Sequence, residues 1–197
     1  MKRPDIVVGT LLLTLILFFG CVQNSDVGSD KFNSTLQFSG NFTQDYYEGN
    51  ADEYRAAYRY TQLTDKYGLY NAGLDIGFAR EMEPADIPTV EEFFEQISDM
   101  TQVHSKTFSK RRIGKYNVDI VDAIISIPVD QSQVSDKYEQ GDLTYTLEAY
   151  SRIYYIRNGN NLMFINVQVY GIDEMPDKPP TDQIYSEVED AILKLEI

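Results

Sequence analysis

Two long stretches of alternating apolar and polar residues, joined by one turn signal, constrain the fold of this chain most strongly. The first covers residues 143–158 and the second covers residues 162–170, with Asn158-Gly159 at the end of the first. Because side chains of a strand point alternately to the two faces of a sheet, such stretches are typical of paired β-strands. The sequence therefore predicts a long β-hairpin here.

The length of the turn decides which residues of this hairpin lie opposite one another. A two-residue turn at Asn158-Gly159 pairs Tyr155 with Leu162, whereas a three-residue loop over 158–160 pairs Tyr155 with Met163. Burying a large apolar side chain contributes about 1.5–3 kcal/mol. Since the longer loop places more apolar pairs on one face, we predict the three-residue loop.

This choice fixes the two faces of the hairpin. Ile153 and Ile165 are then expected to be buried neighbours, with Arg152 and Tyr154 on the opposite face. Five tyrosines also gather on the hairpin, and cross-strand packing is their expected role; a platform for a sugar or peptide is the alternative. They are Tyr145, Tyr150, Tyr154, Tyr155 and Tyr170.

Two helices are predicted outside the hairpin. Thr89 and Glu92 have the spacing of a capping box, and apolar residues recur at helical spacing from Val90 to His104. His104 is expected at the end of that apolar stripe, as a structural residue near the helix C-terminus. A second helix is expected after the Pro-rich segment 176–180, capped by Thr181.

Between the first helix and the hairpin, the apolar parity changes within one predicted strand. Apolar residues occupy even positions up to Ile120 and odd positions from Val121 onward. One buried face accommodates both sets only through an extra residue, so we predict a β-bulge near residues 120–122. Asp119 and Asp122 flank it; they are expected to face solvent, although bulges also occur beside functional sites.

The N-terminus has the pattern of an export signal. Lys2 and Arg3 precede an apolar run over residues 6–20, and Cys21 follows Gly20 directly. The positive-inside rule places the rest of the chain outside the cytoplasm. The run resembles a lipoprotein signal, in which the Cys is lipidated and becomes the mature N-terminus. Phe18 and Phe19 depart from that pattern, so an uncleaved membrane anchor and simple secretion stay open as alternatives.

We expect three segments: a signal peptide or anchor over 1–20, a flexible tether over 21–33 and a single domain over 34–197. Asn33 and Asn41 begin glycosylation sequons. Cys21 is the expected lipidation site. The predicted location is the cell membrane, with the domain on the extracytoplasmic side.

Composition excludes several function classes. The chain carries a net charge of −14, which disfavours binding to nucleic acid because phosphate backbones repel it. One Cys and one His cannot supply the ligands of common zinc sites. No phosphate loop or Gly-x-Ser-x-Gly motif is present. We therefore expect no catalytic, cofactor-binding or metal site.

The order of elements resembles the PsbP-like fold, named for an extrinsic subunit of photosystem II. Three stretches carry the resemblance: residues 89–103 as a helix after the first strands, Arg112-Ile113-Gly114-Lys115-Tyr116 leading into a strand, and residues 154–189 as hairpin plus final helix. The resemblance implies an α+β fold, an antiparallel sheet packed against two helices, in a non-catalytic binding or assembly module. No functional residue transfers.

Two functions follow as hypotheses. The first is a non-enzymatic extracytoplasmic lipoprotein that binds an unknown protein, glycan or small ligand near the membrane. The alternative is a hydrolase at the outer face of the membrane that uses a pair of carboxylates held about 5–9.5 Å apart. A pocket with two buried carboxylates favours the hydrolase, and a shallow surface favours binding.

Overall fold

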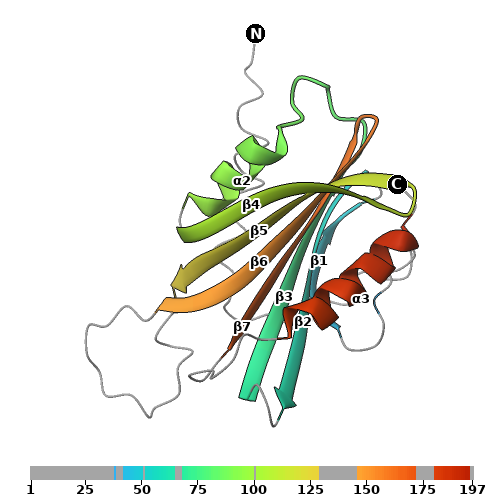
Figure 1. The fold of residues 1–197 in the computed structure, drawn as a ribbon. Helices are drawn as coiled ribbons and strands as arrows, with labels where there is room; N and C mark the ends of the chain where they lie inside the picture. Colours follow the sequence, from blue (N-terminus) through green and yellow to red (C-terminus); the bar gives the residue numbers. More distant parts are fainter. Residues whose placement is uncertain are drawn as a thin grey trace.

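The structure, a computed structural model, describes residues 38, 42–50, 52–64, 68–99, 101–128, 146–171 and 180–195. These residues form one seven-stranded sheet with one helix on each face (Figure 1). The α+β class expected from the sequence is wrong: the described part of the chain is mostly β. Strands of up to 13 residues make up most of it, including a 12-residue strand over Glu53–Thr64, where no element was predicted.

Every neighbouring pair of strands in the sheet is antiparallel. The spatial order is β1-β2-β3-β7-β6-β5-β4, so β1 and β4 are the edges. The strands are β1 (Thr43–Gly49), β2 (Glu53–Thr64), β3 (Gly68–Ala79), β4 (Gln102–Ile113), β5 (Tyr116–Pro128), β6 (Thr146–Asn158) and β7 (Asn161–Gly171). The predicted hairpin, β6 and β7, therefore lies inside the sheet.

Helix α2 (Val90–Ser98) begins at the predicted capping box. The Thr89 hydroxyl accepts a hydrogen bond from the Glu92 backbone at 3.2 Å, and the Glu92 carboxylate accepts one from the Thr89 backbone at 2.8 Å. The helix ends at Ser98, before the predicted end at His104, because strand β4 already begins at Gln102. His104 is thus an exposed residue of a strand.

Helix α3 (Thr181–Leu193) covers the other face of the sheet. Its N-cap is Pro180, and Thr181, predicted as the cap, is instead a buried residue of the first turn. Within the described residues, no helix is long and apolar enough to cross a bilayer.

The two helices create two hydrophobic cores on opposite faces of the sheet. The α3 core contains Tyr154, Ile156, Met163 and Ile165, all of them almost fully buried. The α2 core contains the intervening side chains of the same strands, such as Ile153, Tyr155 and Phe164. Consecutive residues of β6 and β7 are therefore buried on opposite faces.

This arrangement corrects the predicted hairpin register. The turn has two residues, Gly159 and Asn160, with Gly159 in the left-handed region at φ 62°. Ile165 lies opposite Tyr154 rather than Ile153. The prediction assumed a single buried face, and with both faces covered the apolar parity no longer determines the loop length.

Burial on both faces of the sheet also explains why β5 lacks the predicted bulge. Its pairing with β6 runs without a break from Val118 to Pro128. The even positions up to Ile120 pack under α3, and the odd positions from Val121 pack under α2. The parity change thus marks a change of covered face, and the bulge lies in β4 between Val103 and Ser105.

Two glycines of β3 that point to the α2 face offer a test of this packing. A Cβ at Gly77 would lie 2.1 Å from Cε1 of Phe164, whereas a Cβ at Gly73 meets nothing within 4 Å. We expect Gly77→Ala to lower the free energy of unfolding by about 1–3 kcal/mol through overpacking. Gly73→Ala should be neutral or stabilise by up to about 1 kcal/mol. Urea denaturation measures both, and equal effects would contradict the assigned faces.

Candidate functional site

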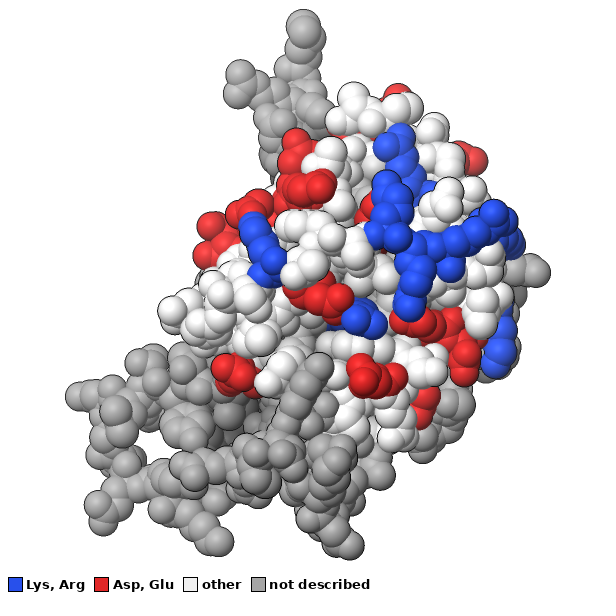
Figure 2. All heavy atoms as spheres, viewed as in Figure 1, with Lys and Arg blue, Asp and Glu red and all other residues white. Residues whose placement is uncertain are grey.

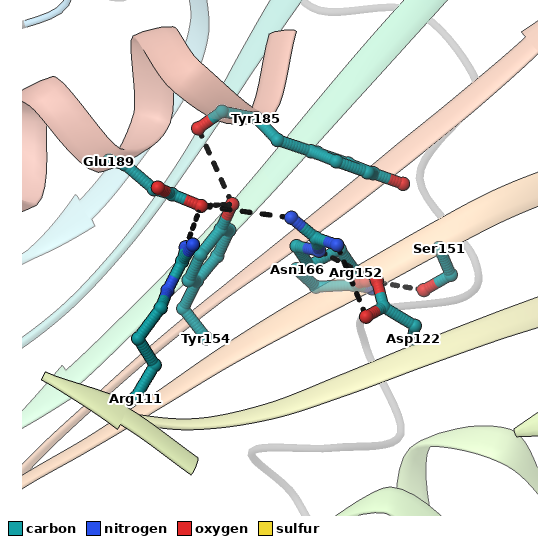
Figure 3. Close-up of polar contacts among 8 residues, drawn as sticks. All are labelled: Arg111, Asp122, Ser151, Arg152, Tyr154, Asn166, Tyr185 and Glu189. Carbon is teal, nitrogen blue, oxygen red and sulfur yellow. Dashed lines mark hydrogen bonds and ion pairs between the residues drawn. The ribbon is translucent and has the colours of Figure 1, made fainter. Parts of the chain in front are cut away.

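Polar side chains gather at two places on the sheet, one on each face. The first is a network centred on Arg152, between the sheet and α3 (Figure 3). The Arg152 guanidinium donates to both carboxylate oxygens of Asp122, at 2.6 Å and 3.1 Å. It also lies 4.1 Å from the ring centroid of Tyr185, which covers it from α3.

Glu189 of α3 forms the other end of this network. Its Oε1 is paired with Arg111 of β4, lies 3.1 Å from the Tyr154 hydroxyl and lies 3.7 Å from the Arg152 guanidinium. Burial, followed by the nearby Glu189 charge, raises the pKa of Tyr154. Tyr154 therefore stays neutral and donates a hydrogen bond.

The Arg152 network holds α3 on the sheet and offers little room for a ligand. Two arginines and two carboxylates form ion pairs with each other, and the Tyr154 hydroxyl donates a hydrogen bond to Glu189. Both carboxylates are thus occupied by guanidinium groups. The hydrolase alternative needs two carboxylates beside an open substrate position, and this network does not provide one.

Arg152→Ala tests the role of the network in stability. We expect the free energy of unfolding to fall by about 1–3 kcal/mol, because Asp122 and Glu189 lose a partly buried partner. Lys110→Ala is the matched control, since the Lys110–Asp119 pair, at 2.9 Å, has a lysine side chain that is 70% exposed. An exposed pair contributes about 0–1 kcal/mol. Equal losses in thermal or urea denaturation would contradict a structural role for Arg152.

The second polar group lies on the α2 face, beside the α2 core, and we call it the Asp75 patch. Its residues come from three adjacent strands and are cross-strand or diagonal neighbours. They are Asn71, Gly73 and Asp75 of β3, Asn166, Gln168 and Tyr170 of β7, and Ser151 of β6. Asp75 lies opposite Asn166, and Gly73 lies opposite Gln168.

Asp75 is the electrostatically unusual residue of this patch. Its side chain is half-buried, and desolvation by burial raises the pKa of the carboxyl to about 7. Within the described part of the chain, no ion pair or hydrogen bond to the Asp75 carboxylate is found. Two arginines of β2, Arg55 and Arg59, are diagonal neighbours of Asp75 in register, and Arg59 is paired with Asp45 at 2.9 Å.

The surroundings of Asp75 supply hydrogen-bonding groups and space. Ser151 donates to the Asn166 amide oxygen at 3.1 Å, and both side chains are buried. Among the described residues, Gly73 leaves open space beside Asp75, because a Cβ built there meets none of their atoms within 4 Å. The Asp75 patch is therefore a polar surface with one carboxyl that lacks a partner among the described residues.

Of the residues singled out from the sequence, Tyr154 and Asp122 lie in the Arg152 network and Tyr170 lies in the Asp75 patch. Cys21, Asn33 and Asn41 lie outside the described residues. Asp119 pairs with Lys110, and His104 lies 2.7 Å from the Ser126 hydroxyl. Of the hairpin tyrosines, Tyr154 and Tyr155 are buried in the two cores, which fits packing rather than a binding platform.

Asp75, Ser151 and Asn166 were not predicted as site residues from the sequence. Asp75 occupies the solvent side of an alternating strand pattern, where a carboxylate is common. Its one signal was the pair of glycines, Gly73 and Gly77, that flank it at the same parity. Small residues on one strand face leave space, but whether that space is filled depends on the side chains of the neighbouring strands.

No protein-family model, no curated protein and no solved structure matches this chain. The resemblance to the PsbP-like fold therefore stays an expectation from element order.

Proposed function

We propose that this chain is a non-enzymatic binding module tethered to the outer face of a membrane, with the Asp75 patch as its ligand site. The N-terminal run ending at Gly20-Cys21 supports the tether. The single observation that carries the binding role is the half-buried Asp75 carboxyl, which lies beside open space and lacks a partner in the described residues. A desolvated carboxylate without a partner costs free energy that a bound cation recovers.

The ligand class we propose is a small polar compound that carries a protonated amine. Its ammonium group pairs with Asp75, and its other polar atoms bond to the amide and hydroxyl groups of Asn166, Gln168 and Tyr170. A metal ion is disfavoured, because the described residues contain no group of three or more His, Cys, Asp or Glu side chains that could hold one.

The same face disfavours catalysis by paired carboxylates. On the α2 face of β3, β6 and β7, the described side chains include no acidic residue other than Asp75. A pair of carboxylates acting as acid and base or nucleophile therefore lacks its second member. Binding without chemistry is the function that this arrangement supports best.

Two matched probes test the proposed site. Ethanolamine and ethylene glycol have the same length, but only ethanolamine carries a positive charge at pH 8. We expect ethanolamine to shift the side-chain amide NMR signals of Asn166 and Gln168, and ethylene glycol to leave them unchanged. Asp75→Asn should abolish the shift, and the exposed-pair control Asp119→Asn should retain it.

Equal shifts with both probes would overturn the role assigned to the Asp75 charge. Shifts that survive in Asp75→Asn, or no shifts with either probe, would overturn the site itself. The tether is tested separately: Cys21→Ser should release the chain from membranes and remove the mass of the lipid. An intact mass that retains Met1 with an unmodified Cys21 would contradict lipidation.

A further inference from the structure

Edge strand β4 differs in charge from the rest of the chain. Residues 102–118 contain five basic residues and no acidic ones, in a chain of net charge −14. Four of them, Lys106, Lys110, Arg111 and Arg112, lie on β4, and Lys115 lies in the following turn. Figure 2 shows basic side chains gathered where β4 and β5 meet, with acidic side chains over the helices around them.

The outer side of β4 is open within the described residues. No described strand pairs with it there, and every side chain from His104 to Arg112 is exposed. About half of the backbone groups of an edge strand in an antiparallel sheet point away from its one partner. After the bulge at residues 103–105, β4 therefore presents a regular strand edge from Ser105 to Arg112.

The side chains on one face of this edge follow a simple order. Lys106, Phe108 and Lys110 lie opposite Ala123, Val121 and Asp119, so they point to the α2 face. Phe108 is 37% exposed and packs edge-to-face with Phe94 of α2. The edge thus offers a cation, an aromatic ring and a second cation at a spacing of two residues.

The lysines already have weak partners, which an incoming chain can replace. Lys106 pairs with Glu95 of α2, and Lys110 pairs with Asp119 at 2.9 Å. Exposed pairs of this kind contribute only about 0–1 kcal/mol each. Arg112 bonds to the Gly114 carbonyl at 3.1 Å and has no carboxylate partner in the described residues.

We infer that β4 is a docking edge for an acidic, extended segment of a partner protein, which adds to the sheet as an eighth strand. Side chains on one face of adjacent strands pair directly, so the segment places acidic residues opposite Lys106 and Lys110 and an apolar residue opposite Phe108. Two copies of this basic edge repel each other, which disfavours pairing of the chain with itself. An anionic membrane supplies charge but no strand hydrogen bonds, and the rest of the domain repels it.

The probe for this inference is the peptide acetyl-Thr-Glu-Thr-Val-Thr-Glu-Thr-amide, with a counterpart that has Lys at both Glu positions. We expect the acidic peptide to slow hydrogen exchange of alternate β4 amides by about tenfold at saturation, since strand addition protects them. The Lys peptide should have no effect. The double variant Lys106→Glu/Lys110→Glu should reverse this preference, and Lys115→Glu should keep it.

Protection of β5 amides in every variant shows that the sheet is intact. Binding of the acidic peptide without protection of β4 amides would overturn strand addition and leave only electrostatic attraction. Strand addition would also be overturned if vesicles with anionic lipids bind the domain at β4 and the peptide does not. Failure of the double variant to prefer the Lys peptide would overturn the assigned pairing.

Discussion

Replacing Ile165 with alanine is expected to lower the free energy of unfolding by about 2–5 kcal/mol. The side chain is fully buried in the α3 core, opposite Tyr154 on β6. Truncation leaves a cavity in the middle of the sheet, where neighbouring strands on both sides limit relaxation. Urea or thermal denaturation measures the loss, and Ile165→Val should cost only about 0.5–1.5 kcal/mol.

The matched control for this core is Leu193→Ala. Leu193 lies at the end of α3 and is 56% exposed, so its truncation should change stability by well under half the Ile165 value. Similar losses at the two positions would mean that Ile165 is not enclosed by α3. The assignment of the odd-numbered side chains of β7 to the α3 face would then be wrong.

Asp75→Asn is expected to stabilise the fold above pH 7 and to have little effect near pH 4. Burial raises the pKa of Asp75 to about 7 in the folded chain, against about 3.9 in an unfolded chain. The folded state therefore binds more protons between these values, so stability falls as pH rises from about 4 to about 7. The shift corresponds to at most about 4 kcal/mol, and partial exposure of the carboxylate reduces this figure.

Thermal denaturation of both proteins from pH 4 to pH 8 measures this effect. The difference in melting temperature should grow with pH and level off above the pKa of Asp75. The ionisable groups near it are Arg55 and Arg59 of β2, which are its diagonal neighbours, and Tyr170 of β7, which stays neutral because burial raises its pKa. A difference that is constant with pH would show that Asp75 is ionised at an ordinary pKa.

Local features of the fold were predictable from the sequence. The capping box at Thr89 and Glu92 and the presence of a turn near Gly159, though not its register, depend on short-range hydrogen bonds and backbone conformation. Such interactions involve residues a few positions apart, so the sequence contains the whole signal. The C-terminal helix was also predicted, although its N-cap is Pro180, which makes no side-chain capping hydrogen bond, and not Thr181.

Features that depend on both faces of the sheet were not predictable. Burial on two faces places apolar residues at odd and even positions of one strand, as in Ile153 and Tyr154. A rule based on one buried face then gives the wrong register and an extra bulge. Helix content was overestimated because His104 continues the apolar spacing of α2 but belongs to β4.

Neither polar group could be assembled from the sequence alone. Arg152 and Glu189 are brought together by the docking of α3, and Asp75 and Asn166 by the pairing of β3 with β7. These contacts join residues far apart in the chain, and no local pattern marks them. What the sequence does mark is charge, since the basic stretch of β4 stands out in an acidic chain.

The most direct test of the proposed ligand site is a carbon-13 NMR titration of the Asp75 carboxyl, with and without ethanolamine. In the free protein we expect a midpoint near pH 7, because burial disfavours the charged form. Ethanolamine should lower that midpoint, because an adjacent ammonium group favours the carboxylate. A midpoint near 4 in the free protein, or a midpoint that ethanolamine leaves unchanged, would contradict the assignment of this patch as the binding site.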